Sequence, residues 1–79
     1  MSSVKKRSVS LGGHRTSYSV EDEFLDILKS MANAQSIPLA RLILQIDIAR
    51  SKDTNLSSAL RLAALNQVKS ERSAANVTG

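Results

Sequence analysis

The chain has 79 residues, contains no cysteine, and carries a formal net charge of +4. This length is enough for one small domain, and the absence of cysteine excludes disulfides and thiolate metal sites. A chain of this size buries a core of marginal stability, so we expect it to oligomerise. No stretch is apolar enough to span a membrane or to act as a secretory signal, so we expect a cytoplasmic protein.

The positive charge is concentrated in the first quarter of the chain. Residues 1–20 contain four basic residues and no acidic one, whereas residues 21–79 contain seven of each. A basic terminus on a neutral body indicates a polyanionic partner. We interpret residues 1–7, which include Lys5, Lys6 and Arg7, as a flexible basic arm.

Alternating residues predict a short β-strand over residues 14–20. The side chains expected on its inner face are Thr16, Tyr18 and Val20, and those expected on its outer face are Arg15, Ser17 and Ser19. Residues 8–11 alternate in the same way. The Gly12-Gly13 pair between the two segments fits either the turn of a hairpin or a hinge.

Three helices are predicted after this strand. The first begins at about Glu21, with Ser19 as its cap and an apolar stripe of Phe24, Ile27, Leu28 and Met31. The second covers about residues 38–50. The third covers about residues 56–68, with Thr54 or Asn55 as its cap. We expect one domain over residues 8–68 and a frayed tail over residues 69–79.

The second predicted helix is apolar on two sides. Leu39, Leu42, Ile43 and Ile46 form one stripe, while Leu44 and Ile48 lie nearly opposite. Such a helix must be covered on both sides, either by a second copy or by the third helix of its own chain. We expect the second copy. The predicted dimer core consists of Tyr18, Val20, Phe24, Leu28, Leu42, Ile43, Leu44, Ile46 and Ile48.

Enzymatic chemistry is poorly represented in the sequence. There is one histidine, no cysteine and no glycine-rich phosphate loop. The acidic residues 21–23 and Asp26 share one turn, which is typical of a charged helix N-terminus. We therefore predict no catalytic site, no metal and no cofactor. His14 alone is interpreted as a surface or phosphate-contacting residue.

The outer face of the predicted strand suits the edges of base pairs. Arginine can bridge two guanine acceptors, and serine hydroxyls donate or accept on several bases. A two-stranded ribbon fits the major groove of DNA, so we expect two chains to pair one strand each. Arg15, Ser17 and Ser19 then contact bases, while Lys5, Lys6 and Arg7 contact phosphates.

Six segments resemble the ribbon-helix-helix family of bacterial and phage repressors. Three follow its general pattern, at residues 15–20, 21–28 and 36–43. Three more resemble a small-protein branch common in alphaproteobacteria: Arg-Ser-Val-Ser-Leu at 7–11, Gly-His-Arg-Thr-Ser at 13–17 and Asn-Leu-Ser-Ser-Ala-Leu-Arg at 55–61.

The resemblance implies a mainly α fold with a short N-terminal strand. It implies an intertwined homodimer with an antiparallel β-ribbon between subunits, to which this chain adds a C-terminal helix. It also implies a phosphate contact at the start of the second helix. Because Pro38 replaces the usual hydroxyl residue, Ala40 and Arg41 would supply that contact. The implied function is transcriptional regulation through double-stranded DNA. The alternative is an antitoxin-like module that binds another protein through residues 55–68.

Overall fold

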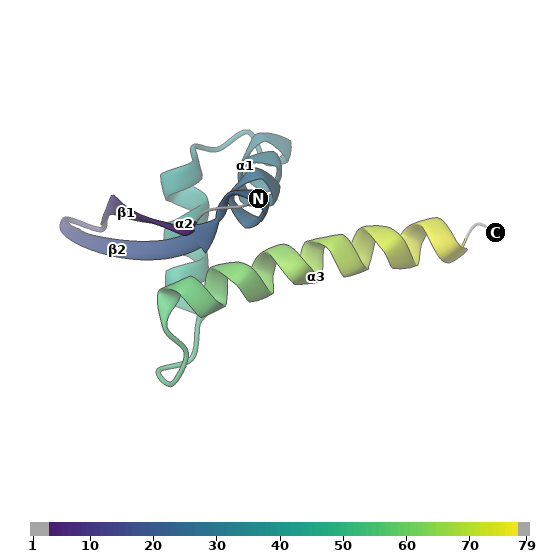
Figure 1. The fold of residues 1–79 in the computed structure, drawn as a ribbon. Helices are drawn as coiled ribbons and strands as arrows, with labels where there is room; N and C mark the ends of the chain where they lie inside the picture. Colours follow the sequence, from purple (N-terminus) through teal and green to yellow (C-terminus); the bar gives the residue numbers. More distant parts are fainter. Residues whose placement is uncertain (1–3, 78–79) are drawn as a thin grey trace.

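The computed structural model describes the backbone of residues 4–77 and the side chains of residues 4–72. The elements follow one another as β1 (Val4–Leu11), β2 (His14–Glu21), α1 (Asp22–Ala34), α2 (Leu39–Ala49) and α3 (Leu56–Val77). In Figure 1 the two strands form a ribbon at one side of the helices, and α3 passes its base and extends well beyond α1 and α2. None of the helices within residues 4–77 is long and apolar enough to cross a membrane.

Both strands of the ribbon belong to one chain. β1 and β2 pair antiparallel, with Val4 opposite Glu21 and Leu11 opposite His14. Gly12 and Gly13 connect them with φ values of 56° and 90°, the left-handed conformations that a tight hairpin turn requires. The glycine pair is thus a hairpin turn, and the prediction of one strand per chain was wrong. Residues 4–7 lie in β1 rather than in a flexible arm, and residues 1–3 lie outside the described residues.

The helices begin close to the predicted positions. Glu21 rather than Ser19 is the residue that precedes α1, because β2 runs directly into the helix. Pro38 precedes α2 in an extended conformation. Asn55 caps α3, where its Oδ1 accepts a 2.8 Å hydrogen bond from the Ser58 backbone N–H. The prediction of a frayed tail was wrong for residues 69–77, because α3 continues to Val77.

The core forms between the inner face of the ribbon and all three helices. The buried residues of this cluster are Leu11, Tyr18, Val20, Leu25, Leu28, Ala32, Leu42, Ile43, Leu56, Leu60 and Ala64. From the predicted dimer core, Phe24, Leu44 and Ile46 are half-buried against the cluster. Ile48 does not join it and is 74% exposed. Leu44 therefore packs within its own chain, and only Ile48 is left uncovered on the second side of α2.

Candidate nucleic-acid interface

The register of the hairpin divides the ribbon into two faces. Residues directly opposite in an antiparallel pair point to the same face. The outer face consists of four cross-strand pairs: Val4 with Glu21, Lys6 with Ser19, Ser8 with Ser17, and Ser10 with Arg15. Ser19 and Glu21 are half-buried and the other six are exposed. The predicted base-contacting residues Arg15, Ser17 and Ser19 thus share this face with four residues of β1.

From Lys6 to the hairpin turn, the outer face is built from serines and cations. Serine hydroxyls donate and accept hydrogen bonds, and the guanidinium of Arg15 presents a fork of donors. The Val4–Glu21 pair at the base of the ribbon adds one apolar and one acidic side chain to this face. Adjacent strands lie about 5 Å apart, so two strands with short side chains fit a groove about 12 Å wide.

The three cations of the predicted arm lie on different faces. Lys6 is on the outer face, whereas Lys5 lies opposite the buried Val20 and Arg7 lies opposite Tyr18. The Arg7 Nη2 contacts Asp22 Oδ1 at 3.5 Å. Burial raises the pKa of the Tyr18 hydroxyl, and the nearby charge of Arg7 partly opposes that rise. Arg7 therefore contacts the body of its own chain.

The base of the ribbon is held by the first turns of α3. The Ser19 backbone N–H donates to Ser57 Oγ at 2.8 Å, and the Ser19 carbonyl accepts from Arg61 at 3.1 Å. Arg61 Nε also donates to Glu21 Oε1 at 2.9 Å, and this contact lowers the pKa of the Glu21 carboxyl. Sequence reasoning assigned no role to Ser57 or Arg61. Both lie in the 55–61 segment that resembles the family, and this resemblance was the only sequence feature that could have pointed to them.

The remaining predicted phosphate contacts lie at two places. His14 is exposed beside the hairpin turn, and Ala40 and Arg41 are exposed in the first turn of α2. The Arg41 backbone N–H already donates to the Pro38 carbonyl at 3.0 Å. The Ala40 backbone N–H has no partner among the described residues. Of the two backbone N–H groups predicted to contact a phosphate here, it is therefore the free one.

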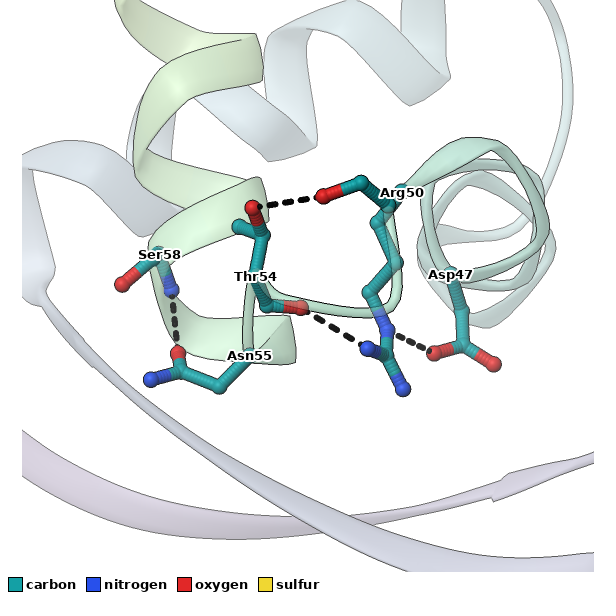
Figure 2. Close-up of polar contacts among 6 residues, drawn as sticks. Asp47, Arg50, Thr54, Asn55 and Ser58 are labelled. Carbon is teal, nitrogen blue, oxygen red and sulfur yellow. Dashed lines mark hydrogen bonds and ion pairs between the residues drawn. The ribbon is translucent and has the colours of Figure 1, made fainter.

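A polar network fixes the loop between α2 and α3 (Figure 2). Arg50 donates to Asp47 Oδ1 at 2.7 Å and to the Thr54 carbonyl at 2.8 Å. The hydroxyls of Ser51 and Thr54 are 3.0 Å apart. These contacts connect the end of α2 to the loop that leads into α3.

An open groove of about 290 Å³ lies beside this loop. Its apolar lining consists of Ile46, Ala49, Ala59, Leu62 and Ala63. Leu62 and Leu65 of α3 are 53% and 47% exposed. Exposed apolar patches of this kind are typical of sites that contact another macromolecule.

A family model described as the ribbon-helix-helix domain matches residues 4–68. The match begins with β1 and ends within α3. No curated protein and no solved structure matches the chain. Within residues 4–72, no cluster of three or more histidine or acidic side chains could hold a metal ion.

Proposed function

Since the chain belongs to the ribbon-helix-helix domain family, whose members are in general DNA-binding transcription regulators, we propose that it regulates transcription by binding specific double-stranded DNA. The observation that carries this proposal is the outer face of the ribbon. Its exposed serines and cations suit the donors and acceptors of base edges in the major groove.

Arg15 is the principal base reader in this proposal. It is exposed near the tip of the ribbon, on the same face as Ser17 and Ser19. Its guanidinium can make two hydrogen bonds to guanine, which the single hydroxyl of a serine cannot match. Lys5, His14 and the start of α2 at Ala40 and Arg41 contact phosphates and set the position of the ribbon.

The protein acts as a homodimer in this proposal. Support comes from the exposed apolar side chains that remain on α2 and α3 after the single-chain core has formed. The fold does not need a partner strand, because β1 and β2 pair within one chain. The second copy is therefore expected to cover the α2–α3 surface, which we define as the groove residues Ile46, Ala49, Leu62 and Ala63.

Binding-site selection on wild type, Arg15→Ala and Arg15→Lys tests the assignment. Wild type should enrich one duplex motif. Arg15→Ala should lose preference at one base pair of each half-site, and Arg15→Lys should retain charge but lose the two-pronged contact. If all three proteins enrich the same motif with equal stringency, Arg15 is not a base reader.

A second candidate function is supported by the α2–α3 surface. Its apolar lining would equally suit a different protein, as in an antitoxin-like partner-binding module. Residues 56–68 are not a free docking segment, because Leu56, Leu60 and Ala64 are buried in the core of the chain. A stoichiometric heterologous partner, released by substitution of Leu62 and bound without DNA, would favour this candidate.

A further inference from the structure

One acidic side chain, that of Glu21, lies on the outer face of the ribbon, and we infer that Arg61 of α3 is a positioning residue for DNA binding that acts by neutralising it. This inference rests on the proposed DNA-binding function. It gives α3 a part in DNA binding that requires no contact between α3 and the DNA.

Glu21 shares the face that is assigned to DNA. The register places it opposite Val4, on the same face as Ser19 and Arg15, and it is the only acidic residue in the two strands. Two residues along a strand cover about 7 Å, which is less than the distance of about 10 Å over which charges act in about 0.1 M salt. A ribbon that brings Ser19 to DNA therefore brings the Glu21 carboxylate within range of the phosphates.

Arg61 is held against Glu21 by two contacts with β2. Its Nε donates to Glu21 Oε1 at 2.9 Å, and its Nη2 donates to the Ser19 carbonyl at 3.1 Å. The Arg61 and Glu21 side chains are 34% and 29% exposed. Ion pairs this close to the surface stabilise a fold by about 1 kcal/mol or less. The larger consequence of the pair is therefore the charge that it cancels on the outer face.

The Glu21 carboxyl does not lose its charge by taking up a proton at neutral pH. The hydrogen bond from Arg61 lowers its pKa, so the carboxyl is ionised when the ribbon approaches DNA. The next acidic residue, Asp22, contacts Arg7 of the ribbon at 3.5 Å. Both acidic residues at the junction of β2 and α1 thus lie beside an arginine, and the one on the outer face depends on α3.

The test is a double-mutant cycle on DNA affinity. Wild type, Arg61→Gln, Glu21→Gln and the double variant are each shown to be folded by circular dichroism. Each is then titrated on two duplexes: the motif that wild type enriches, and an unrelated sequence of the same length. Arg72→Gln is the control, because it removes the same charge from a later, exposed position of α3.

Arg61→Gln should weaken binding to both duplexes by about 3-fold to 10-fold in about 0.05 M salt, because it leaves a bare carboxylate near the phosphates. The loss should shrink in about 0.5 M salt, where charges are screened. Adding Glu21→Gln should restore the affinity to within about 2-fold of wild type, whereas Arg72→Gln alone should change it by less than about 2-fold. Glu21→Gln alone should bind at least as tightly as wild type.

A purely structural role for Arg61 gives a different pattern. The folded Arg61→Gln protein would then bind like wild type, or the double variant would stay as weak as Arg61→Gln. Either result shows that the inference is wrong while the proposed function stands, and so do equal losses for Arg61→Gln and Arg72→Gln. Weaker binding by Glu21→Gln in low salt would overturn the inference even if Arg61→Gln does not fold. If wild type binds neither duplex, the proposed function itself fails.

Discussion

Ser19 in β2 and Ser57 in α3 are joined by a 2.8 Å hydrogen bond from the Ser19 backbone N–H to the Ser57 hydroxyl. This contact links residues 38 positions apart, at the point where the ribbon meets the helices. A strand edge normally exposes such N–H groups to other chains. Here a helix of the same chain satisfies the group, and the ribbon is oriented relative to α3.

Replacing Ser57 with alanine should therefore destabilise the fold. The change leaves the part-buried Ser19 N–H without its acceptor, and we expect the free energy of unfolding to fall by about 1–2 kcal/mol. Ser58→Ala is the matched control, because the Ser58 hydroxyl makes no hydrogen bond among the described residues; it should change stability by less than about 0.5 kcal/mol. Equal urea midpoints for the two variants would contradict the role given to Ser57.

The Glu21–Arg61 contact predicts a loss of stability in acid. Hydrogen bonding to Arg61 holds the pKa of the folded Glu21 carboxyl below its ordinary value of 4.5. A lowered folded pKa stabilises the protein above the unfolded value, and that stability is lost as the pH falls through the folded pKa. Glu21→Gln should reduce stability at neutral pH and flatten the acid limb of the unfolding profile.

The measurement is urea unfolding from about pH 7 down to about pH 2.5. The folded and unfolded states bind different numbers of protons at Glu21 only near and below the ordinary pKa of 4.5. Glu23→Gln removes the same charge from an exposed side chain outside the Arg61 contact and serves as the control. A Glu21→Gln profile parallel to that of wild type over the whole range would show that the contact contributes nothing.

The sequence predicts most of the fold because its strongest patterns are local. The alternation of residues 14–20 and the helical stripes depend on nearby residues, and they located β2 and the helices. β1 was missed between Val4 and Arg7 because its inner positions are Lys5 and Arg7, which break the apolar alternation. Their extended conformation depends on pairing with residues 18–21. The end of α3 was missed because helix-forming residues continue it without an apolar stripe.

The candidate site could be predicted only for one strand. Alternation along β2 placed Arg15, Ser17 and Ser19 on one face. The residues of β1 join this face only if Gly12 and Gly13 form a hairpin turn. Two glycines fit a turn or a hinge equally well, so the sequence did not decide between them. The contacts of Ser57 and Arg61 with β2 depend on the tertiary position of α3, and no periodicity within α3 indicates them.

The hairpin turn should be sensitive to side chains at Gly12. Gly12 has a φ of 56°, and nothing lies within 4 Å of a Cβ placed there. Gly12→Ala therefore strains only the backbone conformation, and we expect the free energy of unfolding to fall by about 1–2 kcal/mol. Gly12→Asn should be tolerated, because asparagine followed by glycine is a favoured sequence for this turn. Thermal unfolding that ranks the asparagine variant at or below the alanine variant would contradict this account.

Ser36 offers a position at which glycine should stabilise the protein. It follows α1 with a φ of 57°, while the Ile37 N–H donates to the Ala32 carbonyl and the Ser36 N–H to the Asn33 carbonyl, each at 3.0 Å. This pattern ends helices and favours glycine in the left-handed position. Ser36→Gly should raise the free energy of unfolding by about 0.5–1 kcal/mol. Ser36→Ala, measured in the same denaturant titration, should give no gain.

The α2–α3 surface should control dimer formation. Leu62 is 53% exposed in the single chain, so Leu62→Glu is compatible with that fold. In a dimer that covers this surface, the new carboxylate is buried without a partner at a cost of about 3 kcal/mol or more, which raises the dissociation constant by roughly 100-fold. Wild type should sediment as a dimer and melt at higher temperature as its concentration rises, whereas Leu62→Glu should be a folded monomer with a constant melting temperature.

Leu62→Met keeps an apolar side chain of similar size and should behave as wild type. A Leu62→Glu protein that remains dimeric would place the interface elsewhere, and a monomeric wild type at micromolar concentration would show that the homodimer proposal is wrong.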